Sequence, residues 1–319
     1  STQGVSSAAS DVYKRQIERA TAEGVPIIAL PVGGGTRMQE GTVAFLQMVK
    51  ITTAVMAHKA SRLPYLVYLR NPTMGGVFAS WGSLGHVTFA QPGALVGFLG
   101  PRVYEALYQS PFPEGIQHTD HLAELGVIDS VLPPEALGEA FARILTVMCD
   151  RPTGHEPHES HAPAELLDLH PWESITRTRR DDRPGIRDLL EVAATNVTML
   201  NGTGDGETHP GSVLALAQWG NASCVVVGQD RADQGRALDP AALREVRRGM
   251  RVARELELPL VSVIDTSGAA LSKEAEERGM APEIARTLSE LLVLPTPTVS
   301  LLMGQGTGGI ALALAPADR

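Results

Sequence analysis

The stretch GVPIIALPVGGGT, at residues 24–36, decides the fold, because ELPLVSVIDTSGA at 257–269 repeats its pattern. In both stretches a proline opens a short apolar run that ends at a glycine-containing turn. One offset of 233 residues relates a series of landmarks, which are Pro26 and Pro259, Gly35 and Gly268, Pro64 and Pro297, Gly75 and Gly308, and Gly76 and Gly309. This constant spacing without a gap indicates an internal duplication.

Each copy is predicted to run in the order strand, glycine turn, helix, strand, paired glycines, helix. The elements expected in the first copy are strands at Ile27–Leu30 and Tyr65–Leu69 and helices at 43–55 and Val77–Ser80. The elements expected in the second copy are strands at Leu260–Ile264 and Val299–Met303 and helices at 284–292 and Ile310–Leu314. Strands that are joined through helices predict an α/β fold with a parallel sheet and helices on its faces.

The length of 319 residues predicts about two domains. A stretch rich in proline and histidine at 151–171 is typical of a linker, so we expect an N-terminal domain at 17–150 and a C-terminal domain at 172–319. Residues 1–16 are small and polar, and are interpreted as a tail or a non-native leader. The linker histidines His155, His158 and His161 lack a carboxylate or thiolate framework, which favours solvated side chains over a metal site.

Composition excludes several classes of protein. The formal charge of −9 repels nucleic acid, and aromatic residues, at 4%, are too few to stack on bases. Cys149 and Cys224 are the two cysteines, which excludes a disulfide scaffold and a four-thiolate zinc site. No apolar run reaches the roughly 18 residues that cross a bilayer. We therefore expect a cytoplasmic protein that binds neither a membrane nor nucleic acid.

Paired glycines between a strand and a helix let a ligand approach the backbone and aim helix N-terminal N–H groups outward. Gly75-Gly76 and Gly308-Gly309 are therefore candidate oxyanion holes, in which backbone donors stabilise a developing negative charge. For one isolated pair, close packing of the helix on the strand is the more common explanation. The duplication at a fixed offset favours function.

Three other features allow different interpretations. The segment Gly304–Gly309 matches the dinucleotide pattern G-x-G-x-x-G, so a dinucleotide-dependent oxidoreductase is an alternative hypothesis. Asp265 follows an apolar run, where an aspartate more often caps a turn than acts as a base. The arginines from Arg177 to Arg187 alternate with aspartates, which favours a self-compensating solvated surface over a phosphate or partner site.

The motifs of the first half resemble those of a known family. They are Gly34–Gly41, Leu63–Tyr65, Asn71–Ser80, Gly97–Val103, Gly115–Gln117 and Gly126–Asp129. This half resembles the carboxyltransferase β subunit of acetyl-CoA carboxylase. The second half resembles the α subunit of the same enzyme, through Ile264–Thr266, Gly268-Ala269, Ala275–Gly279 and Gly304–Gly306. From about Ile17 to Arg319, the chain is similar to the fused β–α carboxyltransferases of actinobacteria.

The resemblance implies two crotonase-like domains, each a β-β-α superhelix. It implies transfer of CO₂ from carboxybiotin on a carrier protein to acetyl-CoA, or to propionyl-CoA, with malonyl-CoA for fatty acid biosynthesis as the product in the first case. Gly75-Gly76 would serve the coenzyme A thioester, and Gly308-Gly309 the ureido oxygen of biotin. The substrate-binding residues that it implies are Gly34, Gly35, Arg37, Arg102, Gly268 and Ala269. The family's two holes meet across a subunit interface, so a homo-oligomer, a biotin carboxyl carrier protein and a biotin carboxylase are expected, and no metal bound by this chain.

The sequence departs from the family pattern in some places. Val32-Gly33 replaces small residues and serine, Ser267 replaces a proline, and Ala270–Lys273 replaces a glycine-rich continuation. Family β subunits begin well before Ile17, often with a four-cysteine zinc ribbon, and α subunits continue past Arg319. Both domains are therefore expected to be incomplete, and a non-catalytic fragment or assembly subunit is a third hypothesis.

Overall fold

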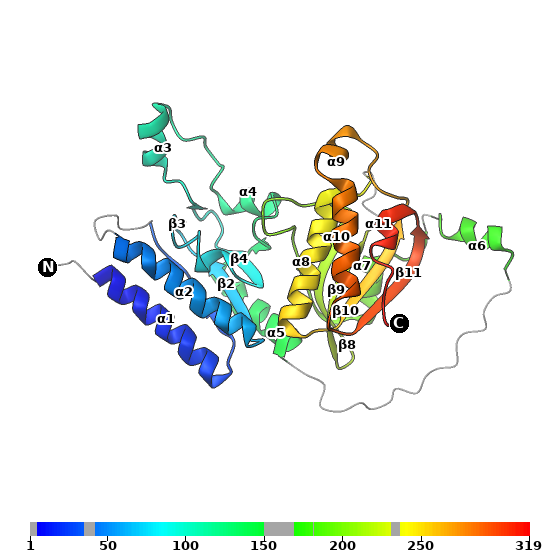
Figure 1. Ribbon diagram of the computed structural model, residues 1–319, viewed down its shortest axis with the longest axis horizontal. Coiled ribbons are helices and arrows are strands. Elements are labelled where there is room, and N and C mark those ends of the chain that lie inside the picture. The colour runs from blue at the N-terminus through cyan, green and yellow to red at the C-terminus, as the bar shows by residue number, and fades with distance from the viewer. Residues whose placement is uncertain (1–4, 35–41, 150–168, 181, 231–236) are drawn as a thin grey trace. The chain divides into compact units, whose positions relative to one another are not determined.

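A computed structural model describes residues 5–34, 42–149, 169–180, 182–230 and 237–319 (Figure 1). The chain forms two compact units. Unit 1 comprises Ser1–Ala142, Leu200–Thr208 and Glu255–Glu257, and unit 2 comprises Arg143–Met199, His209–Arg254 and Leu258–Arg319. The change of unit falls within helix α5 (Leu137–Cys149) rather than at 150. The predicted linker lies outside the described residues as far as residue 168.

Unit 1 is built on a four-stranded parallel sheet in the order β1-β2-β4-β6. Its strands are β1 (Ile27–Ala29), β2 (Tyr65–Leu69), β4 (Val87–Ala90) and β6 (Ser130–Val131). A separate parallel pair joins β3 (Thr73–Met74) to β5 (Val96–Gly97). The helices of this unit are α1 (Val5–Glu23), α2 (Thr42–Ala60), α3 (Pro101–Tyr108) and α4 (Thr119–Glu124), with 3-10 turns η2 (Trp81–Ser83) and η3 (Pro134–Ala136).

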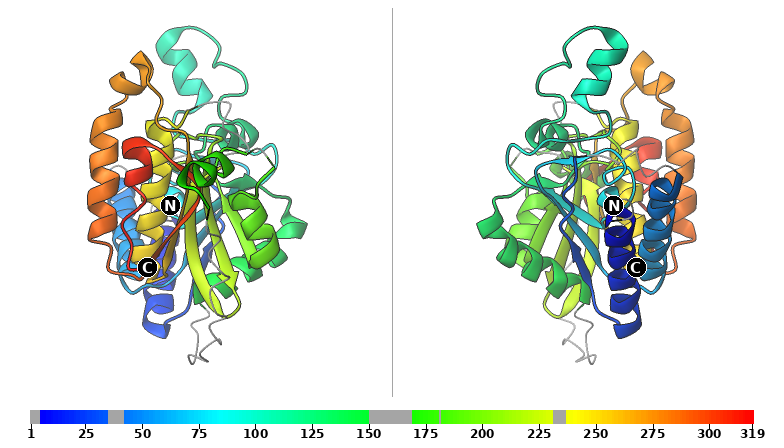
Figure 2. Two further views of the ribbon diagram at one scale, coloured as in Figure 1. Left: turned by 90° about the vertical axis from the view of Figure 1, so that its right-hand side faces the viewer. Right: turned by 90° about the vertical axis from the view of Figure 1, so that its left-hand side faces the viewer.

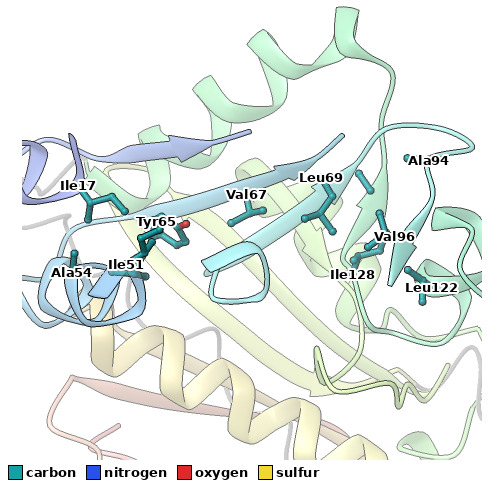
Figure 3. Close-up of a cluster of buried hydrophobic side chains, with 12 residues drawn as sticks. Ile17, Ile51, Ala54, Tyr65, Val67, Leu69, Ala94, Val96, Leu122 and Ile128 are labelled. Atoms are coloured by element: carbon teal, nitrogen blue, oxygen red, sulfur yellow. The ribbon is translucent and has the colours of Figure 1, made fainter. Parts of the chain in front are cut away.

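The core of unit 1 lies between this sheet and the helices α1 and α2. β2 is buried along its whole length because it has a neighbouring strand on both sides. Figure 3 shows the side chains of this cluster, in which Ile17 of α1 and Ile51 of α2 lie near Tyr65 of β2. A continuous apolar run such as Tyr65–Leu69 is what a strand covered on both faces requires.

The prediction of a tail at residues 1–16 is wrong from Val5 onward. Residues 5–16 belong to α1, which ends at Glu23. The polar composition of this segment hid a helix because its exposed face carries i,i+4 ion pairs, among them Lys14 with Glu18. Ile17 is the apolar residue by which the helix enters the core.

Unit 2 contains a five-stranded sheet in the order β11-β10-β9-β8-β7. Its strands are β7 (Thr195–Leu200), β8 (Ser212–Trp219), β9 (Ala222–Gln229), β10 (Leu260–Thr266) and β11 (Thr298–Gly306). β9, β10 and β11 are parallel, whereas β8 and β9 form an antiparallel hairpin. The helices are α6 (Pro171–Arg177), α7 (Ile186–Ala193), α8 (Pro240–Leu256), α9 (Lys273–Glu277), α10 (Met280–Leu292) and α11 (Gly308–Leu312).

Helices cover both faces of the sheet in unit 2. Ile186 and Leu190 of α7 pack on one face, against side chains of β8, β9 and β10. α8 packs on the other face, where Gly249 has no Cβ and so leaves room for Val227 and Leu214. Figure 2 shows α10 beside α8 on that same side of the sheet.

The predicted duplication is confirmed by strand register. Ile27 pairs with Tyr65 across β1 and β2, and adding 233 to both numbers gives Leu260 and Thr298, which pair across β10 and β11. The same arithmetic carries the last residue of α1, Glu23, to Leu256, the last residue of α8. α1 is therefore the counterpart of α8, and the repeat extends further towards the N-terminus than the sequence alone predicted.

Both copies also share an irregularity at the ends of their strands. In unit 2, Ile264 pairs with Leu302 and Thr266 pairs with Gly306, so two residues of β10 face four of β11. In unit 1, Ala29 pairs with Val67 and Gly33 with Thr73, so four residues face six. This shift of two residues bends the chain immediately before each glycine pair, as a β-bulge does.

The helix predicted at Val77–Ser80 is reduced to a single turn. The Ala79 N–H donates to the carbonyl of Gly75, at an N to O distance of 2.9 Å, as in an α-helix. The carbonyl of Val77 instead accepts from Ser80 and Gly82, at 3.4 and 3.0 Å, so the helical ladder stops there. The corresponding prediction in the second copy is confirmed by α11 in its position, although that helix ends at Leu312.

The two copies differ in how the first strand is covered. β10 lies between β9 and β11, whereas β1 is an edge strand of the described sheet. Ile28 and Leu30 are 38% and 48% exposed, but their counterparts Val261 and Val263 are 5% and 0% exposed. A cavity of about 540 Å³ lies beside β1, with a lining that includes Tyr13 and Trp81.

This difference predicts that truncating the smaller side chain costs more stability than truncating the larger one. Val261→Ala removes fewer atoms than Ile28→Ala, yet we expect it to lower the free energy of unfolding by about 2 kcal/mol, because it leaves a cavity. Ile28→Ala is expected to cost less than about 1 kcal/mol, since its side chain is already solvated. Denaturant titration of both variants measures this. An equal or larger loss in Ile28→Ala would contradict the assignment of β1 as an open edge.

A buried histidine holds the start of β2. The Tyr65 N–H donates to Nδ1 of His86 at 3.1 Å, so the ring proton lies on Nε2, 3.1 Å from Oε2 of Glu255. Lys59 pairs with the same carboxylate oxygen at 3.0 Å. Burial, together with the charge of Lys59, outweighs the attraction of Glu255 and lowers the pKa of His86 to about 4. Burial opposes ionisation of Glu255, but hydrogen bonds from His86 and Lys59 lower its pKa to about 2.

Acid is therefore expected to destabilise unit 1 in two ranges of pH. Below the ordinary pKa of 6.5, the unfolded chain binds a proton at His86 that the folded chain does not, so stability falls from pH 6.5 to about 4. Glu255 adds a loss from pH 4.5 to about 2. In His86→Gln the amide oxygen still accepts from Tyr65 but does not titrate. Thermal unfolding at pH 7 and pH 5 should show a smaller decrease for this variant than for the wild type, and an equal decrease would refute the assignment.

Candidate active site

The first glycine pair forms a turn in which Gly75 adopts a left-handed backbone conformation. Gly75 has a φ of 62°, a conformation that L side chains rarely adopt. Its N–H donates to the carbonyl of Gly97 at 2.8 Å, so Gly75 is not a free donor. The N–H groups of the next residues, Gly76, Val77 and Phe78, have no acceptor among the described residues. They form the start of a single helical turn and suit an anionic oxygen.

The second glycine pair has the same conformation. Gly308 has a φ of 72°, and no atom lies within 4 Å of the position that a Cβ would occupy. Thr307 precedes it as the N-cap of α11. Within the described part of the chain, the N–H groups of Gly308, Gly309 and Ile310 have no acceptor. This turn therefore presents its donors from Gly308 onward, one residue earlier than the first turn.

Each unit brings its own two predicted turns together. In unit 1, Gly33 lies against the glycine pair, since a Cβ on it would be 3.2 Å from Cγ2 of Val77, and Gly34 follows it with open space around its Cα. In unit 2, Gly268 lies beside Thr307, and a Cβ on it would be 3.7 Å from Cγ2 of that residue. Ala269 comes next and pairs with Leu238 in an isolated bridge. The predictions at Gly35 and Arg37 fall outside the described residues.

Arg102 lies in the first turn of α3, where its side chain is exposed. Among the described residues it has no hydrogen bond or ion pair, so its guanidinium is available to a ligand. α3 follows β5, whose last residue, Gly97, supplies the carbonyl that holds Gly75. Arg102 is thus on the segment that follows β5, the strand that holds the first glycine turn, and among the described residues no hydrogen bond or ion pair joins it to the turn.

Asp265 neither caps its own turn nor lies exposed as a base would. Its carboxylate is buried and forms an ion pair with Arg183, and the same oxygen accepts the N–H of Gln305 at 3.2 Å. Arg187, from the same arginine-rich segment, pairs with Asp230. The interpretation of Arg177 to Arg187 as a solvated, self-compensating surface is therefore wrong at Arg183, which is largely buried, whereas Arg187 is half exposed but pairs with a distant aspartate. These partners are 43 or more residues away in the sequence, so local charge pattern could not reveal them.

The dinucleotide hypothesis loses its structural basis. Gly304 and Gly306 lie within β11 and do not form a loop that opens a long helix. Glycine is required at 304 because a Cβ there would lie 2.2 Å from both Nη2 of Arg183 and Oδ1 of Asp265. Packing on an ion pair, and not the approach of a phosphate, explains this residue. A shallow cavity of about 290 Å³ joins Gly304–Thr307 to Ser174 and Thr178.

Some residues of the site have roles that depend on distant contacts and that the sequence did not predict. Gly97 holds Gly75 through its carbonyl, and its own lack of a Cβ makes room for the side chain of Gln117, which donates to Leu99 O at 2.7 Å. Gly97 and Gln117 belong to family motifs named above, but those motifs did not indicate what the two residues do. The residues after each glycine pair also supply donors, which the rule for helix N-termini would have indicated.

Within the described ranges, no group of three or more histidine, cysteine, aspartate or glutamate side chains is arranged to hold a metal ion. None of the helices in those ranges is both long and apolar enough to cross a membrane. Among the described residues, no disulfide joins Cys149 or Cys224 to another cysteine. Burial raises the pKa of Cys224 to about 12, which makes that thiol unreactive.

A parallel strand pair that leads into a glycine turn occurs in both units as part of a crotonase-like fold, and solved structures share this fold. Transcarboxylase 12S, described as a hexamer with hydrolysed methylmalonyl-coenzyme A bound, matches 97% of this chain and 61% of its own, with a TM-score of 0.79 and 19% identity. A single-chain, multi-domain long-chain acyl-CoA carboxylase matches 96% of this chain and 30% of its own, with a TM-score of 0.75 and 20% identity.

The chain belongs to the carboxyl transferase domain family, whose model matches residues 5–319. It is 56% identical over 315 residues to a probable biotin-dependent acyl-coenzyme A carboxylase beta3 subunit of Mycobacterium tuberculosis, covering 98% of this chain and 63% of that protein. It is 35% identical over 335 residues to the acetyl-coenzyme A carboxylase carboxyl transferase subunits beta/alpha of Salinispora tropica, covering 98% and 58%. The chain thus spans about three fifths of the length of these relatives.

Proposed function

We propose that this chain is the carboxyltransferase component of a biotin-dependent acyl-CoA carboxylase. The observation that carries the proposal is the pair of glycine turns, which occur in the same register of two duplicated folds and present unpaired N–H groups. The family membership supports it. The substrate is proposed to be acetyl-CoA and the product malonyl-CoA, as for the relative from Salinispora tropica, with propionyl-CoA as the alternative.

The first turn is proposed to hold the carbonyl oxygen of the acyl-CoA thioester. When the α-carbon loses a proton, negative charge moves onto that oxygen, and donors aimed at it stabilise the charge more in the transition state than in the ground state. Gly76, followed by Val77 and Phe78, provides such donors. The sequence predicted Gly75 as a donor to the substrate, but its N–H is already bonded to the carbonyl of Gly97. We assign it the role of fixing the turn.

The second turn is proposed to hold the ureido oxygen of biotin. Carboxybiotin, which a carrier protein supplies, is the CO₂ donor, and its ureido oxygen gains negative charge as the carboxyl group leaves. The geometry at Gly308 fits an oxygen atom there, because the space beside its Cα is open and its N–H has no acceptor in the part of the chain that the structure describes. Gly309 and Ile310 continue the same row of donors. Gly268 and Ala269 lie on the adjoining turn and are proposed to line the site.

The wider assembly is also a proposal. The relatives are named as subunits of biotin-dependent carboxylases, which supports a biotin carboxyl carrier protein and a biotin carboxylase as partners. The hexamer described for transcarboxylase 12S supports a homo-oligomer. A cytoplasmic role in fatty acid biosynthesis would follow from malonyl-CoA as the product. Gly34, Gly35 and Arg37 remain proposed substrate-binding residues beside the first turn.

Two glycines with similar positive φ values allow a controlled test of the second turn, with one in the turn and the other as the control. Gly308 and Gly24 have φ values of 72° and 67°, and neither has an atom within 4 Å of a Cβ position. Changing either to alanine should cost about 1 kcal/mol of stability, because L residues avoid this conformation. Only Gly308→Ala is expected to lower the biotin-dependent decarboxylation of malonyl-CoA, by about tenfold or more. Alanine keeps the N–H, but its Cβ would enter the open space proposed for the ureido oxygen, and its avoidance of positive φ would turn the donor away. Loss of one oxyanion donor costs about 10² or more.

The measurement follows release of CO₂ from malonyl-CoA with and without biocytin, a soluble biotin derivative. Absence of any biotin-dependent turnover in the wild type, with methylmalonyl-CoA tried as well, would sink the proposed function in favour of a non-catalytic assembly role. Equal losses in Gly308→Ala and Gly24→Ala would remove the second turn from the mechanism. Retained activity in Gly24→Ala is the control for strain.

Arg102 generates a separate prediction about coenzyme A. Its exposed guanidinium has no partner among the described residues, and coenzyme A carries phosphates that arginine binds well. Arg102→Ala should raise the KM for malonyl-CoA about tenfold or more while kcat and thermal stability stay nearly constant, since one charged hydrogen bond contributes about 1.5–3 kcal/mol. Arg15→Ala, in the exposed face of α1, is the control. An unchanged KM would remove Arg102 from the binding set.

A further inference from the structure

The shift of register before the second glycine turn places one acidic residue opposite a short bulge. Ile264 pairs with Leu302, and Thr266 pairs with Gly306, so Asp265 faces the segment Met303–Gln305. Backbone polar groups in a bulge lose their regular ladder partners and need others. Here the carboxylate of Asp265 accepts the Gln305 N–H at 3.2 Å.

Arg183 completes this arrangement. Its Nη2 pairs with the same carboxylate oxygen of Asp265, and its Nη1 donates to the carbonyl of Met303 at 3.2 Å. Its Nε donates to the carbonyl of Thr178 at 2.8 Å, which holds the guanidinium in place. The two side chains are 12% and 1% exposed, so water competes little with these bonds. One ion pair thus binds one carbonyl and one N–H of the bulge.

The bulge lies directly before the donors of the second turn. Gln305 is followed by Gly306, Thr307 and Gly308, and the Thr307 N–H donates to the carbonyl of Thr266 at 3.3 Å. On the other side of the glycine pair, the carbonyl of Ile310 accepts from the side chain of Gln229 at 3.5 Å. Gln229 in turn accepts the N–H of Asp265 at 3.0 Å. Asp265 is therefore connected to the chain both before and after Gly308-Gly309.

The first copy achieves the same bulge without charge. At the offset of 233, Gln305 corresponds to Pro72, which has no N–H, and Asp265 corresponds to Val32. Met303 corresponds to Arg70, whose carbonyl accepts from the hydroxyl of Thr73 at 2.7 Å. A proline and a threonine therefore meet the needs that Asp265 and Arg183 meet in the second copy. The ion pair occurs in unit 2 and has no counterpart at the equivalent positions of unit 1 given above.

We propose that Arg183 and Asp265 are positioning residues that set the direction of the Gly308 and Gly309 N–H groups. They do not contact the substrate. Their catalytic consequence rests on the proposed function, in which this turn holds the ureido oxygen of biotin. On that basis, substitutions in the pair should impair the reaction with biotin. They should leave binding of the acyl-CoA thioester nearly unchanged, because the first turn is supported by other residues.

The first test needs no activity. Amide hydrogen exchange is measured on the full chain for wild type, Arg183→Lys, Asp265→Asn and Arg247→Lys. Lysine has a single charged nitrogen and cannot reach Thr178, Met303 and Asp265 together. Arg247→Lys is the matched control, because Arg247 pairs with the buried Glu283 in the same unit and makes no contact with the turn. In peptides covering 305–310, exchange of the hydrogen-bonded amides of Gln305 and Thr307 should rise about tenfold in the first two variants, and exchange of the bonded Gly75 amide should stay as in wild type.

The second test separates the two substrates. In the biocytin-dependent decarboxylation of malonyl-CoA, Arg183→Lys and Asp265→Asn should raise the KM for biocytin or lower kcat about tenfold or more, with less than a twofold change in the KM for malonyl-CoA. Arg247→Lys should leave these constants unchanged, while thermal unfolding reports what each substitution costs in stability. Equal losses in the kinetic constants for biocytin and for malonyl-CoA would overturn the assignment of the pair to the biotin site.

The outcomes distinguish the inference from the function on which it rests. Unchanged exchange at 305–310 in both Arg183→Lys and Asp265→Asn, or the same increase in Arg247→Lys, would overturn the positioning role whatever the activity. Increased exchange confined to that turn, in a wild-type chain without biotin-dependent turnover, would support the positioning role and refute the proposed function. Should Asp265→Asn fail to fold, Arg183→Lys carries both tests, because it retains the positive charge beside the buried carboxylate.

Discussion

The pairing of two parallel strands, with a shift of two residues near their ends, is the constraint on which the rest of each unit depends. Ile27 with Tyr65 and Leu260 with Thr298 fix the register, and the shift then turns the chain out of the sheet. Where the chain leaves, a residue with positive φ is needed, and glycine supplies it at Gly75 and Gly308. The free N–H groups beyond each glycine follow from this geometry, because the first turn of a helix has no carbonyl to bond them.

Each copy must satisfy the backbone groups that the shift of register displaces, and the two copies do so by different chemistry. Pro72 removes a donor, and Thr73 supplies a hydroxyl, so the first turn is supported by local and neutral groups. Asp265 and Arg183 are 82 residues apart and are both charged, so the second turn depends on correct assembly of distant elements. A buried ion pair costs desolvation free energy and is stabilising only when its hydrogen bonds are complete. Here Met303, Gln305 and Thr178 add three hydrogen bonds to the pair, which connect it to this bent backbone.

The sequence was sufficient where the determinants are local and repeated. Strand β2 was predicted with its correct ends because Pro64 and the apolar run define them, and the offset of 233 survived as strand register. The helical nature of residues 5–16 was missed, since the exposed face of a helix can be polar throughout. The contacts of Arg183 and of Gly97 could not be predicted, because each joins segments that only the folded sheet brings together. The same limitation explains why Gly75 looked like a donor while its N–H is occupied.

Backbone donors explain how a duplicated fold can serve two different oxygen atoms. A backbone N–H is present whatever the side chain, so substitutions cannot easily remove it, but its direction depends on the φ and ψ angles that neighbouring residues impose. The first turn presents its donors from Gly76 and the second from Gly308, although the two glycine pairs are in equivalent positions. The difference arises because the carbonyl of Gly97 in β5 takes the N–H of Gly75, whereas Gly308 has open space beside it. Specialisation of the two copies therefore lies in the segments that support each turn, and the glycines themselves are the part that both copies retain.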